Sequence, residues 1–237
     1  MVASRTVVQA RRQTRPAKLR AGRARRAAPA EPRIRILDSA EALFADRGFY
    51  GASMRDIAKL ANVVPSHVVY AFGTKEELYA ATLARRIDEL VHERAERLSE
   101  VEQAKKPDLE AILESYVAPL LEKVSKGSEG WRRYGQLVAQ VSHQRKMFEL
   151  EAMNETLEKL DERGLALIQS IRRAVPGLGQ RDALFGFLFF VNAMLHIFAE
   201  TGRVERMSHD KYTSRDAGVL CAVLIPFCAG GFRALAK

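Results

Sequence analysis

Apolar residues recur at every third or fourth position through most of the chain, beginning just after Arg33. The first such stretch carries Ile36, Leu37, Ala40, Leu43 and Phe44. This spacing places apolar side chains on one face of an amphipathic helix. No stretch of the sequence alternates apolar and polar residues with the period of two that a half-buried strand requires. The pattern therefore predicts an all-α fold.

Short-range signals divide the region that follows this first helix. Gly48 can end the helix in a left-handed conformation. Ser53, with Asp56 three residues later, has the pattern of a capping box at the start of a second helix. Asn62 tolerates the positive φ of a sharp turn, and Pro65 suits the first position of a third helix. The sequence thus predicts two short helices separated by a tight turn.

Longer helices are predicted for the rest of the chain. Thr74 and Glu77 form a second capping box, which opens a fourth helix that extends to about Val101. The same periodicity predicts further helices at 108–126 with Pro119 inside, 130–143, 145–175, 181–201 closed by Gly202, and 214–235.

The two short helices and the preceding helix have the order of a helix-turn-helix unit, whose second helix enters the major groove of DNA. On the third helix, Val68 is predicted to face inward, while Ser66, His67 and Tyr70 face outward toward base edges or phosphates. Lys75 stands at the start of the next helix, where its charge and the free N–H groups can hold a phosphate. The alternative is a helical hairpin without a ligand.

Residues 36–83 resemble the N-terminal domain of the TetR family of bacterial transcriptional regulators. The resemblance is carried by "LFADRGF" at the end of the first helix, by "SMRDIAKLA" in the second, and by the "YAFGTKEEL" junction. It implies an all-helical homodimer, in most cases a repressor. Such a protein releases a near-palindromic operator when a small molecule enters the C-terminal domain.

Individual residues take roles from this resemblance by position. Arg55 matches a residue of the second helix that can reach a guanine, and Lys75 matches a phosphate-contacting lysine. Val64 stands where the family commonly has a capping serine, and Val69 replaces the usual first aromatic residue of the recognition helix. The DNA-binding residues expected on both grounds are Arg55, Val64, Ser66, His67, Tyr70 and Lys75.

The C-terminal part resembles the family more loosely, through "MLHIFAETGRVERMS" and the apolar helix that follows it. This resemblance implies a domain that binds a small hydrophobic effector. The expected organisation is a disordered basic tail at 1–32, a helix-turn-helix DNA-binding domain at 33–79, and a helical ligand-binding and dimerisation domain at 80–237.

Two stretches, 183–199 and 217–232, are apolar on nearly all sides. Both are shorter than the roughly 18 to 20 apolar residues that span a bilayer. We therefore expect them to form a homodimer interface and not a membrane anchor.

The effector pocket is expected between these interface helices and the predicted helix 145–175. Asn192 and His196 lie four residues apart on one helical face, and such residues are more often hydrogen-bonded core or interface residues than ligand contacts. The candidate ligand-binding residues are Trp131, Met153, Phe187, Asn192 and His196.

The net charge of +9 is concentrated in one segment. Residues 1–30 hold nine basic residues and no acidic one, which leaves 29 of each sign in the rest of the chain. The tail can be an arm that attracts DNA phosphates, a solvated extension, the product of a misassigned start site, or an organellar transit peptide. Cys221 and Cys228 are about 10 Å apart along one helix, too far for a disulfide, so we expect a reducing, cytoplasmic setting.

The sequence contains no glycine-rich phosphate loop, no nucleophile elbow and no cysteine-pair metal knuckle. We therefore expect no enzymatic activity, no cofactor and no metal site. A helical enzyme with an unrecognised site and a membrane-associated helical protein remain the alternatives.

Overall fold

The computed structural model of the 237-residue chain describes residues 30–104, 108–141, 151–199, 201–214 and 216–237. Within these ranges the regular elements are all helices, which confirms the predicted all-α fold. Residues 1–29 of the predicted disordered tail lie outside the described residues, and residues 30–32, which were expected in the tail, belong to the first turn of α1. The elements are α1 (Ala30–Gly51), α2 (Met54–Leu60), α3 (Pro65–Phe72), α4 (Lys75–Glu102), α5 (Leu109–Lys126), α6 (Glu129–Val141), the short 3-10 helix η1 (Glu151–Met153), α8 (Asn154–Ala174), α9 (Gln180–Ile197), α10 (Arg203–Ser208) and α11 (Ala217–Leu235).

The local signals of the N-terminal region act where the sequence predicts them. Gly48 has a φ of 67° within α1, and Asn62 has a φ of 52° in the turn between α2 and α3. Pro65 opens α3, and Val64 before it makes no side-chain capping bond. The capping box of Thr74 and the residue three positions later is complete. These short-range interactions fix the ends of α2, α3 and α4.

The start of α2 differs from the predicted capping box in one bond. The Ser53 hydroxyl oxygen accepts a bond from the backbone N–H of Asp56 at 3.1 Å, as predicted. The Asp56 carboxylate accepts a bond from the Ser53 hydroxyl at 2.7 Å. A complete box would use the Ser53 backbone N–H, which the longer side chain of glutamate or glutamine usually reaches.

The C-terminal helices begin and end at other residues than predicted. α9 ends at Ile197, and not at the predicted boundary of Gly202. Gly202 has a φ of 63° and instead directly precedes α10. The described part of the predicted helix 145–175 begins as a helix only at Asn154, after η1. α11 begins at residue 217 because the Asp216 side chain caps it, accepting a bond from the N–H of Val219 at 3.0 Å.

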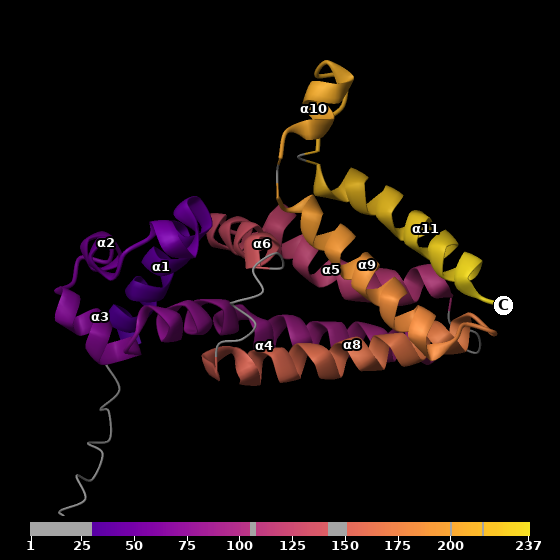
Figure 1. Ribbon diagram of the computed structural model, residues 1–237, viewed down its shortest axis with the longest axis horizontal. Coiled ribbons are helices and arrows are strands. Elements are labelled where there is room, and N and C mark those ends of the chain that lie inside the picture. The colour runs from indigo at the N-terminus through magenta and orange to yellow at the C-terminus, as the bar shows by residue number, and fades with distance from the viewer. Residues whose placement is uncertain (1–29, 105–107, 142–150, 200, 215) are drawn as a thin grey trace, which may run out of the picture.

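Figure 1 shows α1, α2 and α3 gathered at one end of the molecule, with α4 running from them along its length. α8 lies beside α4, while α5, α9 and α11 cover the other side. α10 projects away from the body between α9 and α11. Two hydrophobic clusters result. The N-terminal cluster joins α1–α3 and the start of α4 to Leu137, Val141 and Met153, and the C-terminal cluster fills the space between α4, α5, α8, α9 and α11.

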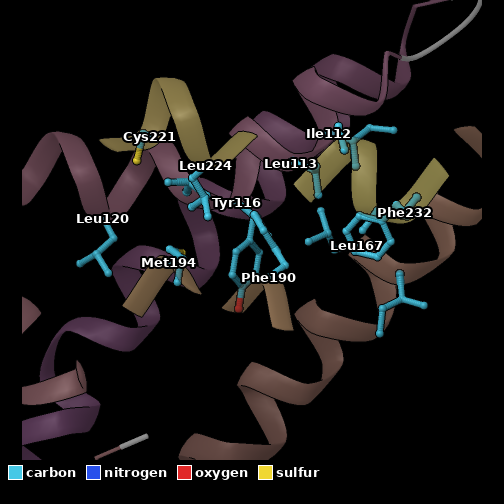
Figure 2. Close-up of a cluster of buried hydrophobic side chains, with 14 of the residues drawn as sticks. Ile112, Leu113, Tyr116, Leu120, Leu167, Phe190, Met194, Cys221, Leu224 and Phe232 are labelled. Carbon is cyan, nitrogen blue, oxygen red and sulfur yellow. The ribbon is translucent and has the colours of Figure 1, made fainter. Parts of the chain in front are cut away.

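The C-terminal cluster is built from aromatic and branched side chains of helices that are far apart in the sequence. Figure 2 shows Tyr116 of α5 and Phe190 of α9 together with Leu224 of α11. Gly186 of α9 permits the close approach of α11, because a Cβ there would lie 2.4 Å from the Phe232 ring. Burial raises the pKa of Cys221 in this cluster to about 11, so its thiol acts as an apolar filler.

Among the described residues one helical segment, Gly218–Leu235, is long and apolar enough to cross a membrane by length and composition. This corrects the expectation that both apolar stretches are too short, because α11 continues three residues beyond the predicted stretch 217–232. Of this segment 22% is buried within the chain. Most of α11 therefore has its surface open to another molecule.

Candidate nucleic-acid interface and ligand site

The third helix presents one apolar and one polar face. Val68 and Phe72 are buried in the N-terminal cluster and fix the rotation of α3. Ser66, His67 and Tyr70 are exposed, as the sequence predicts. The hydroxyl and imidazole groups of α3 are therefore placed on the surface of the molecule, where a groove of DNA can reach them.

Arg33 of α1 braces the far end of α3. Its Nη1 donates to the carbonyl oxygen of Ala71 at 2.9 Å, and its guanidinium carbon lies 4.2 Å from the centre of the Phe72 ring. A cation at this end of a helix also offsets the partial negative charge of the last carbonyls. The sequence gives no signal for this role, which depends on how α1 crosses α3. The basic tail thus joins the described chain beside the recognition helix.

The two cations carried over from the family lie on either side of α3 in the sequence. Arg55 is exposed on α2 and makes no ion pair among the residues that the structure describes. Lys75 is the first residue of α4, and its Nζ lies 4.5 Å from the centre of the Phe49 ring. Lys75 therefore stands at the N-terminus of α4, where a cation and free backbone N–H groups can together hold a phosphate oxygen.

A buried ion pair joins α1 to the rest of the molecule, and we call it the Glu41–Arg86 joint. Glu41 is only 2% exposed, and Arg86 of α4 donates to its two carboxylate oxygens at 2.9 and 3.0 Å. Gly130 of α6 packs against the pair, since a Cβ there would lie 2.6 Å from Arg86 Nη2. The Arg86 guanidinium also lies 4.4 Å above the Trp131 ring. Three helices therefore meet at one desolvated charge pair.

The expected ligand residues lie in different surroundings. Trp131 is half-buried at the Glu41–Arg86 joint, and Met153 is buried in the N-terminal cluster. Phe187 packs against the C-terminal cluster, with its ring 5.9 Å from that of Tyr116. The Asn192 amide donates to the carbonyl of Leu188 within α9 at 2.9 Å, and His196 is exposed. Met153 and Phe187 thus belong to separate hydrophobic clusters.

A cavity of about 170 Å³ lies between α4, α5 and α8. None of the five expected ligand residues lines it, although Phe187 contacts its wall residue Tyr116. Two arginines, Arg94 and Arg163, do line it. Sequence reasoning missed both, because charged residues in a largely polar helix are usually solvated.

The outer faces of α9 and α11 carry large apolar side chains in contact with solvent. The most exposed are Phe189 and Phe227, at 67% and 75%. α9 and α11 pack against each other, so we treat the exposed apolar sides of the two helices together as one surface. We call this surface the α9–α11 face. Its exposed members are Leu184, Phe185, Leu188, Phe189, Val219, Val223 and Phe227.

Two family models match the chain. Residues 36–82 match the model described as "Bacterial regulatory proteins, tetR family", and residues 114–231 match "Tetracyclin repressor-like, C-terminal domain". A curated relative, the HTH-type transcriptional activator FasR of Mycolicibacterium smegmatis, is 41% identical over 61 residues. These residues are 26% of this chain and 28% of FasR, so the curated relative is matched over about a quarter of its length.

Solved structures share the fold at low identity. The transcriptional regulator FadR of Bacillus subtilis, in complex with stearoyl-CoA, superposes with a TM-score of 0.59 at 13% identity, covering 84% of this chain and 98% of FadR. AibR, in complex with isovaleryl coenzyme A and operator DNA, gives 0.58 at 21% identity, covering 82% of this chain and 98% of AibR. The matches at both ends of the chain and the shared helical fold lead to one conclusion: the chain belongs to the TetR family of bacterial transcriptional regulators.

Proposed function

We propose that this regulator binds a near-palindromic operator as a homodimer, with α3 in the major groove, and that a small hydrophobic effector changes its affinity for DNA. The outward polar face of α3 carries this proposal. Val68 and Phe72 lock the rotation of that face, and Arg33 braces its far end. A face fixed from both sides can present Ser66 and His67 to bases in a defined register.

The α9–α11 face supports the homodimer. Exposed apolar patches of this kind in soluble proteins mark interaction sites. A two-fold axis through the face would bury the same side chains on both protomers in a four-helix contact. Two recognition helices would then reach successive major grooves, roughly 34 to 36 Å apart. The same contact would cover the apolar surface of α11 without a membrane, in keeping with a cytoplasmic regulator.

The effector is proposed by analogy with the solved relatives, which hold stearoyl-CoA and isovaleryl coenzyme A. Both molecules join an apolar acyl chain to an anionic carrier. We propose a repressor that the effector releases from DNA. Activation is the second candidate, because the relative FasR is named a transcriptional activator.

The DNA contacts are tested by two substitutions on DNA from upstream of the regulator's own gene. Arg55→Ala is expected to cost about 1 to 3 kcal/mol on the operator and little on unrelated DNA, because a base contact is lost. Lys75→Ala is expected to weaken binding to all sequences and to lower the salt slope by about one unit. Gel shifts at several salt concentrations measure both effects.

The matched control is Arg181→Ala, which removes an exposed cation at the start of α9, far from α3. It should bind operator like the wild type. If Arg55→Ala and Lys75→Ala also match the wild type at fixed salt, the proposed docking of α2 to α4 on DNA is wrong.

The basic tail gives a separate prediction. Deletion of residues 1–30 removes nine positive charges and leaves a chain with equal numbers of acidic and basic residues. Because Arg33, near the start of the described chain, contacts the end of α3, loss of the tail should weaken operator binding and reduce the dependence of log Kd on log salt. Fluorescence anisotropy across a salt series measures the slope. Equal slopes for the full-length and truncated proteins would show that the tail does not contact DNA.

A further inference from the structure

The cavity between α4, α5 and α8 combines apolar walls with two cationic side chains. Leu98 of α4, Tyr116 of α5 and Leu167 of α8 supply the large apolar walls. Ala95 and Ala166 fill the space between them, and the hydroxyls of Ser99 and Ser115 also face the cavity. Such a lining suits an apolar ligand with one polar group whose position is fixed.

Arg94 is the unusual member of this lining. It is 6% exposed, and its Nε donates to the carbonyl oxygen of Tyr116 at 2.9 Å. Its guanidinium carbon lies 3.8 Å from the centre of the Tyr116 ring. Among the residues that the structure describes, no carboxylate lies within 4.0 Å of its nitrogens. A buried cation without a counter-charge is costly and needs a reason to persist.

Neighbouring arginines of α4 show that this situation is specific to Arg94. Arg86, eight residues earlier, is paired with the buried Glu41. Arg97, three residues later, is paired with Glu122 at 2.9 Å. Both have the counter-charge that Arg94 lacks among the described residues. Within the described ranges, the α4 helix therefore carries one buried guanidinium whose contacts are a carbonyl oxygen and an aromatic ring, without a carboxylate.

Arg163 brings a second donor to the same cavity from α8. Its Nε is buried and has no acceptor within the described part of the chain, while its Nη2 pairs with the exposed Glu162 at 2.6 Å. The one carboxylate in the lining, Glu102, is already engaged by Arg173 and by the Ser170 hydroxyl. Glu102 thus lines the same cavity but is bonded to partners on α8, and neither cavity arginine forms an ion pair with it.

We propose that this cavity is the effector site, and that Arg94 and Arg163 bind the anionic head group of an effector whose apolar chain lies against Leu98, Tyr116 and Leu167. The ligand class is an amphiphile with a carboxylate or a phosphate at one end. A volume of about 170 Å³ holds the head group and the first part of the chain. The inference rests on the proposed function, since it names the chemistry and the site of the same effector.

Calorimetry with three probes of equal chain length tests the head group on the full-length protein. Octanoate carries a carboxylate, heptyl phosphate a phosphate, and octanamide neither charge. One of the two anions is expected to bind at least about 10-fold more tightly than octanamide, because hydrogen bonds to a charged partner are stronger than neutral ones. The preferred anion identifies the head group. Equal affinity for all three probes would overturn the proposal.

Arg94→Met locates the site, and Arg97→Met is the matched control on the same helix. Arg94→Met should weaken the preferred anion by about 10- to 100-fold and leave octanamide nearly unchanged. Arg97→Met should leave both unchanged. Arg163→Met provides a second test if Arg94→Met fails to fold, and it should weaken the same anion. The anion lies elsewhere if folded Arg94→Met binds it with wild-type affinity. If Arg94→Met does not fold, wild-type affinity in Arg163→Met would show the same.

Two further measurements separate this proposal from the proposed function. Without ligand, Arg94→Met should melt at or above the wild-type temperature, because an apolar side chain replaces a buried charge. Operator binding by the ligand-free wild type is measured by gel shift. A protein that binds operator but shows no anion preference defeats the cavity assignment alone. A protein that binds the anion but no operator defeats the proposed function alone.

Discussion

Phe189→Arg is expected to produce a folded monomer that binds a palindromic operator at least about 100-fold more weakly than the wild type. The side chain is 67% exposed on α9, so an arginine there meets water in the monomer and leaves the fold intact. In the proposed dimer the same arginine would be buried without a partner charge, at a cost that opposes association. A monomer engages one half-site, and the loss of the linked second half-site reduces affinity by about 10² to 10⁴.

Analytical ultracentrifugation at micromolar concentration measures the association, and gel shifts measure operator affinity. Leu165→Arg is the control, because Leu165 is a similarly exposed apolar residue on α8, outside the α9–α11 face. It should remain dimeric and bind operator normally. A wild-type protein that is monomeric under these conditions, yet binds a palindrome tightly, would refute the two-fold model.

The second large effect is expected at the Glu41–Arg86 joint. Glu41→Gln should lower the free energy of unfolding by about 3 kcal/mol, because it leaves the Arg86 charge desolvated and without its carboxylate. Urea denaturation at one fixed protein concentration measures the change, since a dimer's stability depends on concentration. The double substitution Glu41→Leu with Arg86→Met should recover part of the loss by removing both charges.

Asp38→Asn is the control for this experiment. Asp38 pairs with Arg85 at 2.6 Å on the same two helices, but its side chain is more than half exposed. Its loss should cost no more than about 1 kcal/mol, as is usual for surface pairs. Equal effects of Glu41→Gln and Asp38→Asn would mean that the buried pair contributes no more than a surface one.

Short-range signals explain why the N-terminal helices could be predicted from the sequence. The limits of α2 and α3 depend on residues that act on their own neighbours, such as Ser53, Asn62 and Pro65. The outward position of His67 follows from the burial of Val68 next to it. Periodicity and capping therefore suffice for the recognition helix and the exposed side chains on it.

Features that depend on contacts between distant helices could not be predicted in this way. Arg94 and Glu41 lie in helices whose polar residues mostly face solvent, and they are buried only because α5 and α4 pack over them. Gly202 was misread as the end of a helix because a left-handed glycine can equally precede one. Glu205 of the short α10 instead ties this helix to the segment after it, because its carboxylate accepts a bond from the Ser214 backbone N–H. This bond is the main cause that lowers the pKa of Glu205 to about 2.

The unbroken length of α4 has a mechanical consequence. Its 28 residues make a rod of about 42 Å that contains both Lys75 at the DNA end and Arg94 at the cavity. The two residues are 19 positions apart, which is about 28 Å along the helix, so a tilt of about 5° pivoting at Arg94 would move Lys75 by about 2.5 Å. In a symmetric dimer the two displacements add to about 5 Å, while the major grooves stay about 34 Å apart. In the proposed dimer the helix would act as a lever, and its length would set how far a small rearrangement at Arg94 is amplified at the end that carries Lys75.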